Sequence, residues 1–143
     1  MAFDDYGYSV GLRNVGSYQI SGHPYITGSR METDDEIFVG FPSVARGFTV
    51  INSGSQAGEG TVGPILRIHF NSSADGNVTT DAGRHYITLE SDDQSITFHT
   101  KCTGVFITCV GNGGGDGGFE VLANLTGIMD TNMYALTGSG LTD

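Results

Sequence analysis

Apolar and polar residues alternate along much of this chain. In the segment PILRIHFN, the apolar residues Leu66, Ile68 and Phe70 fall on one side. Arg67 and His69 fall on the other side. Side chains of a β-strand point alternately to its two faces, so this period of two predicts a strand with one buried face.

The same alternation recurs in the segments RHYITLES, QSITFHTKC and GFEVLANLT. The runs DDEIFVGFPSV and GFTVIN predict two further strands, and the nearly all-apolar run GVFITCV predicts a strand that is buried on both faces. The apolar positions of these segments form the predicted core, which comprises Phe48, Val50, Leu66, Ile68, Phe70, Ile87, Leu89, Ile96, Phe98, Phe119 and Val121.

Glycine-rich segments separate these apolar runs, and helical spacing over 11 or more residues is absent from the sequence. Short strands at regular spacing, joined by turn residues, are typical of an antiparallel sandwich. We therefore expect about eight to ten strands. The sequence predicts an all-β fold, a single antiparallel β-sandwich of jelly-roll or immunoglobulin-like topology, over residues 1–143.

The first 29 residues differ from the rest, because they place aromatic residues among glycines without regular alternation. The stretch NVGSYQISGHPYITGS allows two interpretations. It can be an extended arm that lies on a partner, or Tyr18, Ile20, Tyr25 and Ile26 can form the first hairpin of the sandwich. Aromatic anchors dominate many interfaces. The predicted interface therefore comprises Tyr6, Tyr8, Tyr18, Tyr25 and, near the C-terminus, Tyr134.

The charge of the chain excludes two classes of partner. Sixteen acidic residues oppose six basic ones, for a formal net charge of −10, and the basic residues are spread singly. A nucleic-acid-binding surface needs clustered basic residues, and an anionic membrane attracts the same feature. We therefore expect neither nucleic acid nor a membrane as a partner.

The termini and the cysteines indicate where the chain folds. The N-terminal MAFDDYGYSV carries acids where a signal peptide carries bases, and no apolar run reaches the roughly 20 residues of a membrane span. Cys102 and Cys109 are separated by seven positions along a predicted hairpin, and two buried thiols are favoured over a disulfide. We expect the chain to fold in a cytoplasm.

Candidate metal ligands do not form a recognisable pattern. His23, His69, His85 and His99 could share a site, but none of them lies at the spacing of paired ligands. Isolated structural histidines are the favoured interpretation. No cofactor or metal is predicted.

Two acidic or glycine-rich segments could bind calcium. Residues 111–116 approach a calcium-binding repeat motif but occur as a single copy, so a hairpin loop is favoured. The cluster Glu32, Asp34, Asp35 and Glu36 lacks the spacing of an EF-hand, and a solvated loop is favoured. No nucleophile motif such as G-x-S-x-G is present, and we assign no catalytic residues.

Several segments together resemble a known family. They are VGLRNVGSYQISGHPYITGS, FPSVARGFTVINSG, LRIHFNS, HYITLES, ITFHTKCTGVFI, FEVLANLTGI and MYALTGSGLTD. In this order they look like small virion structural proteins of tailed phages, especially marine and cyanobacterial phages. The opening NVGSYQISG and the ending LTGSG are the most specific parts of the resemblance, which covers nearly the whole chain.

The resemblance implies a non-enzymatic capsid decoration or cement protein on the surface of the phage head. Its implied partners are the major capsid protein or other virion proteins, and its implied state is a homo-oligomer. Its implied location is the virion, which assembles in the host cytoplasm. A neck or tail structural protein, or a carbohydrate- or receptor-binding module, are the alternatives.

Overall fold

The structure is a computed structural model. It describes residues 11–13, 15, 23–54, 64–75, 85–90, 93–110, 116–138 and 140–141. The predicted interface residues Tyr6, Tyr8 and Tyr18 and the loop 111–115 lie outside the described residues.

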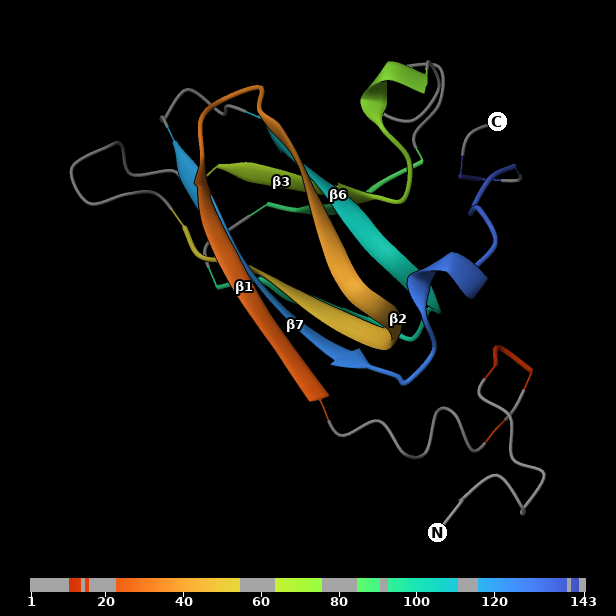
Figure 1. Ribbon diagram of the computed structural model, residues 1–143. Helices are drawn as coiled ribbons and strands as arrows, with labels where there is room; N and C mark the ends of the chain where they lie inside the picture. The colour runs from red at the N-terminus through yellow and green to blue at the C-terminus, as the bar shows by residue number, and fades with distance from the viewer. Residues whose placement is uncertain are drawn as a thin grey trace, which may run out of the picture.

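Seven β-strands and two short 3-10 helices make up the regular structure of the described residues. The strands are β1 (His23–Met31), β2 (Glu36–Asn52), β3 (Ile65–His69), β4 (Ile87–Leu89), β5 (Ser95–Phe98), β6 (Cys102–Val110) and β7 (Gly117–Leu125). The 3-10 helices are η2 (Ser73–Asp75) and η3 (Asp130–Asn132). The prediction of an all-β fold is therefore confirmed (Figure 1).

All strand pairs are antiparallel, and the strand order is β1-β7-β2-β6-β3-β4, with β5 paired to β2. The first part of β2 pairs with β6, whereas its second part pairs with β7 and β5. We call β1, β7, the second part of β2 and β5 the first layer. We call the first part of β2, β6, β3 and β4 the second layer.

The strand β2 is longer than the sequence pattern indicates. The two expected strands in this region are one strand of 17 residues. Its register shifts between Gly40 and Ala45, and again between Ala45 and Gly47. Such irregularities bend a strand, which lets β2 contribute to both layers without an intervening loop.

The buried side chains of both layers form one core. Met31 of β1 and Leu89 of β4 come from opposite ends of the strand order, yet they belong to the same cluster of buried residues. The ring of Phe48 stacks on Phe98 at 4.8 Å between centroids and meets Phe70 edge-on at 6.1 Å. Because Phe70 follows β3, these contacts join the two layers across the interior.

Most of the predicted core is buried. Seven of the predicted residues are at most 4% exposed: Phe48, Val50, Leu66, Ile68, Leu89, Phe119 and Val121. Phe70, Ile96 and Phe98 are partly buried and pack against this cluster. The prediction for Ile87 is wrong, because its side chain is 43% exposed. Ile87 lies on β4 at the edge of the sheet, where a strand has a neighbour on one side only.

The strand β6 is buried on one face rather than on both, which corrects the prediction from its apolar composition. Val105, Ile107 and Cys109 are fully buried, whereas Phe106 and Thr108 between them are half-buried. Cys102 and Cys109 are both buried and unpaired, as predicted, but they lie on this single strand and not on a hairpin.

A fully buried amide ties the end of β2 to the second layer. The Asn52 Nδ2 group donates to the carbonyl oxygen of Pro64 at 2.8 Å and to that of Leu89 at 3.4 Å. Its Oδ1 atom accepts a hydrogen bond from the Gly54 backbone at 3.0 Å. A buried polar group is costly unless its hydrogen bonds are made, so this arrangement fixes how β2 meets β3 and β4.

The N-terminal segment enters the sheet at His23. All nine residues of β1 pair with β7, and Figure 1 shows the two strands side by side at the edge of the sheet. Tyr25 points inward and packs against Phe41, with 5.8 Å between ring centroids. Residues 23–29 are therefore an edge strand of the sandwich, while Tyr18 and Ile20 of the predicted hairpin lie outside the described residues.

Candidate functional site

The outer surface of the first layer has a shallow apolar groove. Its volume is about 450 Å³, and Ile26, Ile51 and Leu122 provide its aliphatic lining, with Glu120 also at its wall. Apolar surface next to a concave region is typical of places where another molecule binds.

The register of the sheet creates this groove. Leu122 lies opposite Ile26 of β1 and opposite Thr49 of β2. Because Val121 and Ala123 point into the core, the alternation along β7 turns Leu122 outward. Ile26 is 76% exposed and Leu122 is 42% exposed, so two neighbouring aliphatic side chains lie uncovered on one face.

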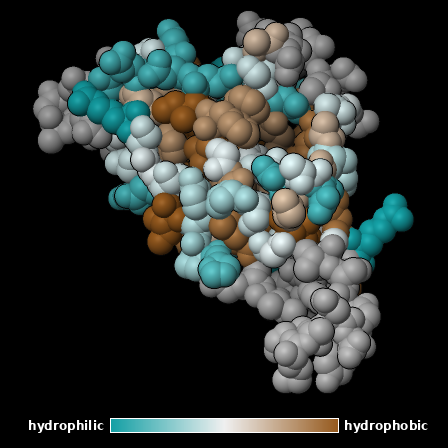
Figure 2. All heavy atoms as spheres, in the orientation of Figure 1, coloured by the Kyte–Doolittle hydropathy of each residue, from teal (hydrophilic) through white to brown (hydrophobic). Residues whose placement is uncertain are grey.

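Other exposed apolar side chains lie elsewhere in the described part of the chain. Figure 2 shows hydrophobic residues in several separate places among hydrophilic ones. Among the described residues, the exposed large apolar residues outside the groove are Val15, Phe38, Ile87, Met129 and Tyr134. Single exposed apolar residues are normal on a protein surface. The Ile26–Leu122 pair differs because its members are adjacent across two strands and border a groove.

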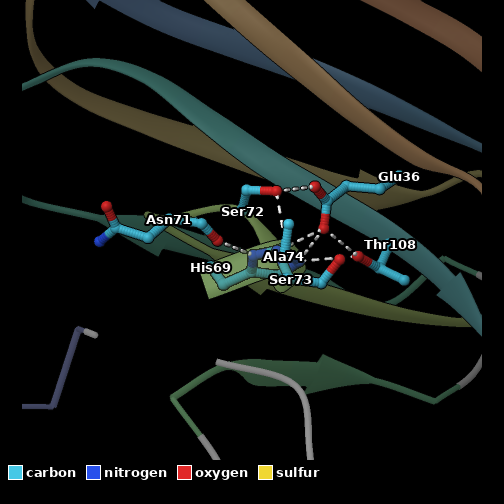
Figure 3. Close-up of polar contacts among 7 residues, drawn as sticks. All are labelled: Glu36, His69, Asn71, Ser72, Ser73, Ala74 and Thr108. Atoms are coloured by element: carbon cyan, nitrogen blue, oxygen red, sulfur yellow. Dashed lines mark hydrogen bonds and ion pairs between the residues drawn. The ribbon is translucent and has the colours of Figure 1, made fainter. Parts of the chain in front are cut away.

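The outer surface of the second layer carries a polar network instead. The Glu36 carboxylate accepts a hydrogen bond from the Ser72 hydroxyl at 2.8 Å and from the Ser73 backbone at 2.9 Å. Thr108 of β6 lies 3.4 Å from the same carboxylate, and His69 lies 3.8 Å from it. Figure 3 shows these groups converging from β2, β3, β6 and the segment after β3.

The hydrogen bonds of His69 locate one of its ring protons. Its Nδ1 atom lies 2.6 Å from the carbonyl oxygen of Asn71, which can only accept, so Nδ1 carries a proton. Its Nε2 atom lies 2.7 Å from the Thr108 hydroxyl. In a neutral imidazole Nε2 accepts from the Thr108 hydroxyl, whereas in an imidazolium it donates to Thr108, which then donates to Glu36 at 3.4 Å.

The environment shifts the pKa values of both ionisable groups. Burial lowers the pKa of His69, and the charge of Arg67 lowers this pKa further. The hydrogen bond to Asn71 and the charge of Glu36 raise the same pKa, but burial outweighs them. Burial alone raises the pKa of Glu36, but hydrogen bonds from Ser73 and Ser72 and the nearby His69 bring it below its ordinary value. The network therefore favours a neutral imidazole beside a charged carboxylate.

This network holds a loop against the sheet. In some enzymes a histidine accepts a hydrogen bond from a hydroxyl and acts as the base for that nucleophile. Here, however, the imidazole is 1% exposed, stacks on Phe106 with an interplanar angle of 7°, and has both nitrogens engaged. The geometry supports anchoring of residues 71–73 over β3 and β6. The Asn71 side chain extends the network by donating to the Leu136 carbonyl oxygen at 2.7 Å.

The acidic cluster near residue 34 forms the turn between β1 and β2. Asp34 has a φ of 69°, and its backbone N–H donates to the Cys109 carbonyl oxygen at 2.9 Å. The Glu32 backbone donates to the Asp35 carboxylate at 3.0 Å. Glu32, Asp34 and Asp35 are exposed, as predicted for a solvated loop. The prediction is wrong for Glu36, whose carboxylate belongs to the polar network.

The predicted interface tyrosines have different surroundings. Tyr25 is half-buried against Phe41, whereas Tyr134 is 64% exposed. Neither Tyr25 nor Tyr134 lines the apolar groove. An interface role for the predicted tyrosines stays a prediction.

The other candidate ligands are dispersed. His23 and His99 are exposed, and His85 is half-buried. His69 lies on the polar face of its strand as predicted, but the network buries it there. Within the described residues, no group of three or more metal-ligating side chains comes together. Burial raises the pKa of Cys102 to about 11 and also raises that of Cys109, so both remain thiols at neutral pH.

Helices that could cross a membrane are also absent from the part of the chain that the structure describes.

Sequence reasoning missed the partners that complete the network. Glu36 was grouped with exposed acids, and neither Thr108 nor Asn52 was singled out. The only local signal was a polar residue, Thr108, inside the apolar run of β6. Its partners are contributed by segments that are distant along the chain, so periodicity could not identify them.

Comparisons with known proteins add little to this description. No protein-family model and no curated protein matches the chain. One solved structure, "Crystal structure of PirA", is similar with 15% sequence identity over 77% of this chain and 99% of that chain. Its TM-score is 0.29, so the similarity carries no argument about function.

Proposed function

We propose that this chain is a non-enzymatic structural protein of a tailed-phage virion that decorates the surface of the head. The outer face of the first layer is its docking surface for the major capsid protein or another virion protein. The resemblance of the sequence to small phage virion proteins supports the class of protein.

The observation that carries the proposal is the groove beside Ile26 and Leu122. Ile26, which is 76% exposed, lies on an edge strand, and the described residues leave most of it uncovered. Burial of apolar surface contributes about 25 cal/mol per Å², so a partner that covers this pair gains stability on binding. An apolar face beside an edge strand suits a protein that becomes part of a larger assembly.

The proposal predicts that the chain is present in purified particles of the phage that encodes it. Mass spectrometry would detect it, and antibody labelling in electron micrographs would distinguish heads from necks and tails. Labelling of necks or tails would overturn the position on the head. Absence of the chain from purified particles would overturn the virion function altogether.

The docking face can be tested with a charge placed in the groove. We expect Ile26→Glu to reduce binding to particles that lack the protein by about tenfold or more, because the partner would bury a carboxylate against aliphatic side chains. Ile87→Glu is a matched control, since Ile87 is also an exposed isoleucine but belongs to the second layer. Equal loss of binding in both variants would contradict the assignment of the face.

Carbohydrate or receptor binding is the alternative class. It predicts saturable binding of the purified chain to members of a glycan array, which the decoration function does not require.

A further inference from the structure

A second hollow lies beside the apolar groove on the outer face of the first layer. Its volume is about 200 Å³, and its polar lining includes Arg46, Thr97, His99 and Asn124. Leu122 lines both hollows, so the polar one continues directly from the apolar one. In the described residues, no carboxylate lines this polar hollow.

A bulge in β2 directs Arg46 to this place. Ala45 pairs with Leu125 and Gly47 pairs with Asn124, so Arg46 is an extra residue without an opposite partner on β7. Bulges commonly change the direction of a side chain near binding sites. A Cβ atom on Gly47 would lie 2.7 Å from the Phe98 carbonyl oxygen, so glycine at this position also lets β5 approach and close one side of the hollow.

The polar groups of the hollow are available to a ligand. The Thr49 and Thr97 hydroxyls bond to each other at 2.8 Å. Within the described part of the chain, the side chains of Arg46, His99 and Asn124 make no hydrogen bond or ion pair. Arg46 presents a planar fork of N–H donors, and the Asn124 amide and His99 ring can add further donors. Such a group of donors is suited to a carboxylate.

We propose that this hollow binds the carboxylate of an aspartate or glutamate side chain on a protein partner. An aliphatic side chain two residues away in the same extended segment then occupies the neighbouring groove of Ile26, Ile51 and Leu122. Residues two apart point to the same side of an extended chain, which matches the two adjoining hollows. This inference rests on the proposed function, since it names the partner chemistry for the same docking face.

The net charge of the chain restricts where an acidic group of a partner can bind. A protein with a formal net charge of −10 repels acidic surfaces in general, so an acidic partner needs a local cationic site to approach. Arg46 supplies that charge next to the aliphatic pair. The combination selects a partner segment with one acid and one aliphatic residue over a segment that is only acidic.

The test uses the full chain and two capped peptides, Ac-Ile-Thr-Glu-NH2 and Ac-Ile-Thr-Gln-NH2. In titrations followed by ¹H–¹⁵N NMR, we expect the glutamate peptide to bind about tenfold or more tightly than the glutamine peptide. The shifted amides should include those of Arg46, Gly47, Leu122 and Asn124. Arg46→Ala should remove the difference between the peptides, whereas Arg13→Ala, which removes an exposed arginine outside the hollow, should preserve it.

Other results would overturn the inference. Equal affinity of both peptides, no binding of either at millimolar concentration, or shifts away from the hollow would each contradict a carboxylate site. Glucuronic acid binding as tightly as the glutamate peptide would instead assign the hollow to acidic sugars. The virion function is tested separately, by the presence of the chain in purified particles. The chain can be present in particles while the peptides fail to bind, and the peptides can bind while the chain is absent from particles.

Discussion

The two outer faces of this sandwich differ in whether their polar side chains form hydrogen bonds within the chain. On the second layer, the Glu36 carboxylate and His69 are enclosed by residues 71–73 and satisfied by hydrogen bonds within the chain. On the first layer, Arg46 and Asn124 lie in a hollow without such partners among the described residues. The Glu36–His69 network is completed by the chain itself, whereas the hollow of the first layer presents groups that a second molecule can use.

Exposed apolar residues occur on both layers, because Phe38 of the second layer is 54% exposed and Leu122 of the first layer is 42% exposed. Phe106 on the second layer packs between Phe38 and His69, with centroid distances of 4.7 and 5.9 Å. The Phe38 ring also covers Gly104, where a side chain would collide with it. Ile26 of the first layer is 76% exposed, so the described residues cover it less than they cover the half-buried Phe106. The proposed docking face therefore rests on the adjacent Ile26–Leu122 pair and its groove, and not on exposure alone.

The largest effect is expected from the core that both layers share. Phe48 is 1% exposed and contacts Phe41, Phe70 and Phe98. Phe48→Ala should lower the free energy of unfolding by about 3–5 kcal/mol, through lost burial and a cavity. Urea unfolding followed by circular dichroism would measure the change. If the two layers were independent units, two separate transitions would appear, and the comparison of two faces of one domain would fail.

Next in size is the substitution of the network carboxylate. Glu36→Gln keeps the shape of the side chain but replaces one acceptor oxygen with a donor that faces other donors. We expect a loss of about 1–3 kcal/mol in the free energy of unfolding. Glu120→Gln on the first layer, where the carboxylate is exposed, should change stability by less than about 0.5 kcal/mol. Similar values for both variants would remove the distinction between the faces.

Acidification should weaken the second layer in two steps. The pKa of His69 is lowered in the folded state, so its contribution to stability is complete above the unfolded value, about 6.5, and is lost as pH falls through the folded value. Glu36, whose pKa is also lowered, adds a further loss below its unfolded value of about 4.3. Its carboxylate and the Arg67 guanidinium are the charged groups that influence His69.

Denaturant unfolding at a series of pH values would measure this dependence. His69→Gln should flatten the decline of stability between neutral pH and about pH 5, since the titrating imidazole is removed. An unchanged decline would show that other groups control acid stability.

The smallest change in stability is expected from a substitution on the outer face of the first layer. Leu122→Thr replaces an exposed aliphatic residue with another residue that favours strands, so the free energy of unfolding should change by about 0.5 kcal/mol or less. Binding to particles should nevertheless weaken. A large loss of stability would mean that Leu122 serves the fold of its own chain rather than a partner.

The sequence by itself determined the strands and the facing of most side chains. In residues 119–125 the set Phe119, Val121 and Ala123 alternates with the set Glu120, Leu122 and Asn124, and the structure buries the first set and exposes the second. This succeeded because the period of a strand is a local property of the backbone. The burial of Cys102 and Cys109 followed from the same apolar pattern.

Only the tertiary structure decided which outward-facing residues are covered and which are joined. His69 alternates with buried residues and was expected on a polar face, yet the segment after β3 folds back and buries it. The direction of Arg46 depends on a bulge against β7, about 80 residues away along the chain. Alternation assigns a residue to a face, but covering segments and strand register come from distant parts of the chain, which local periodicity does not encode.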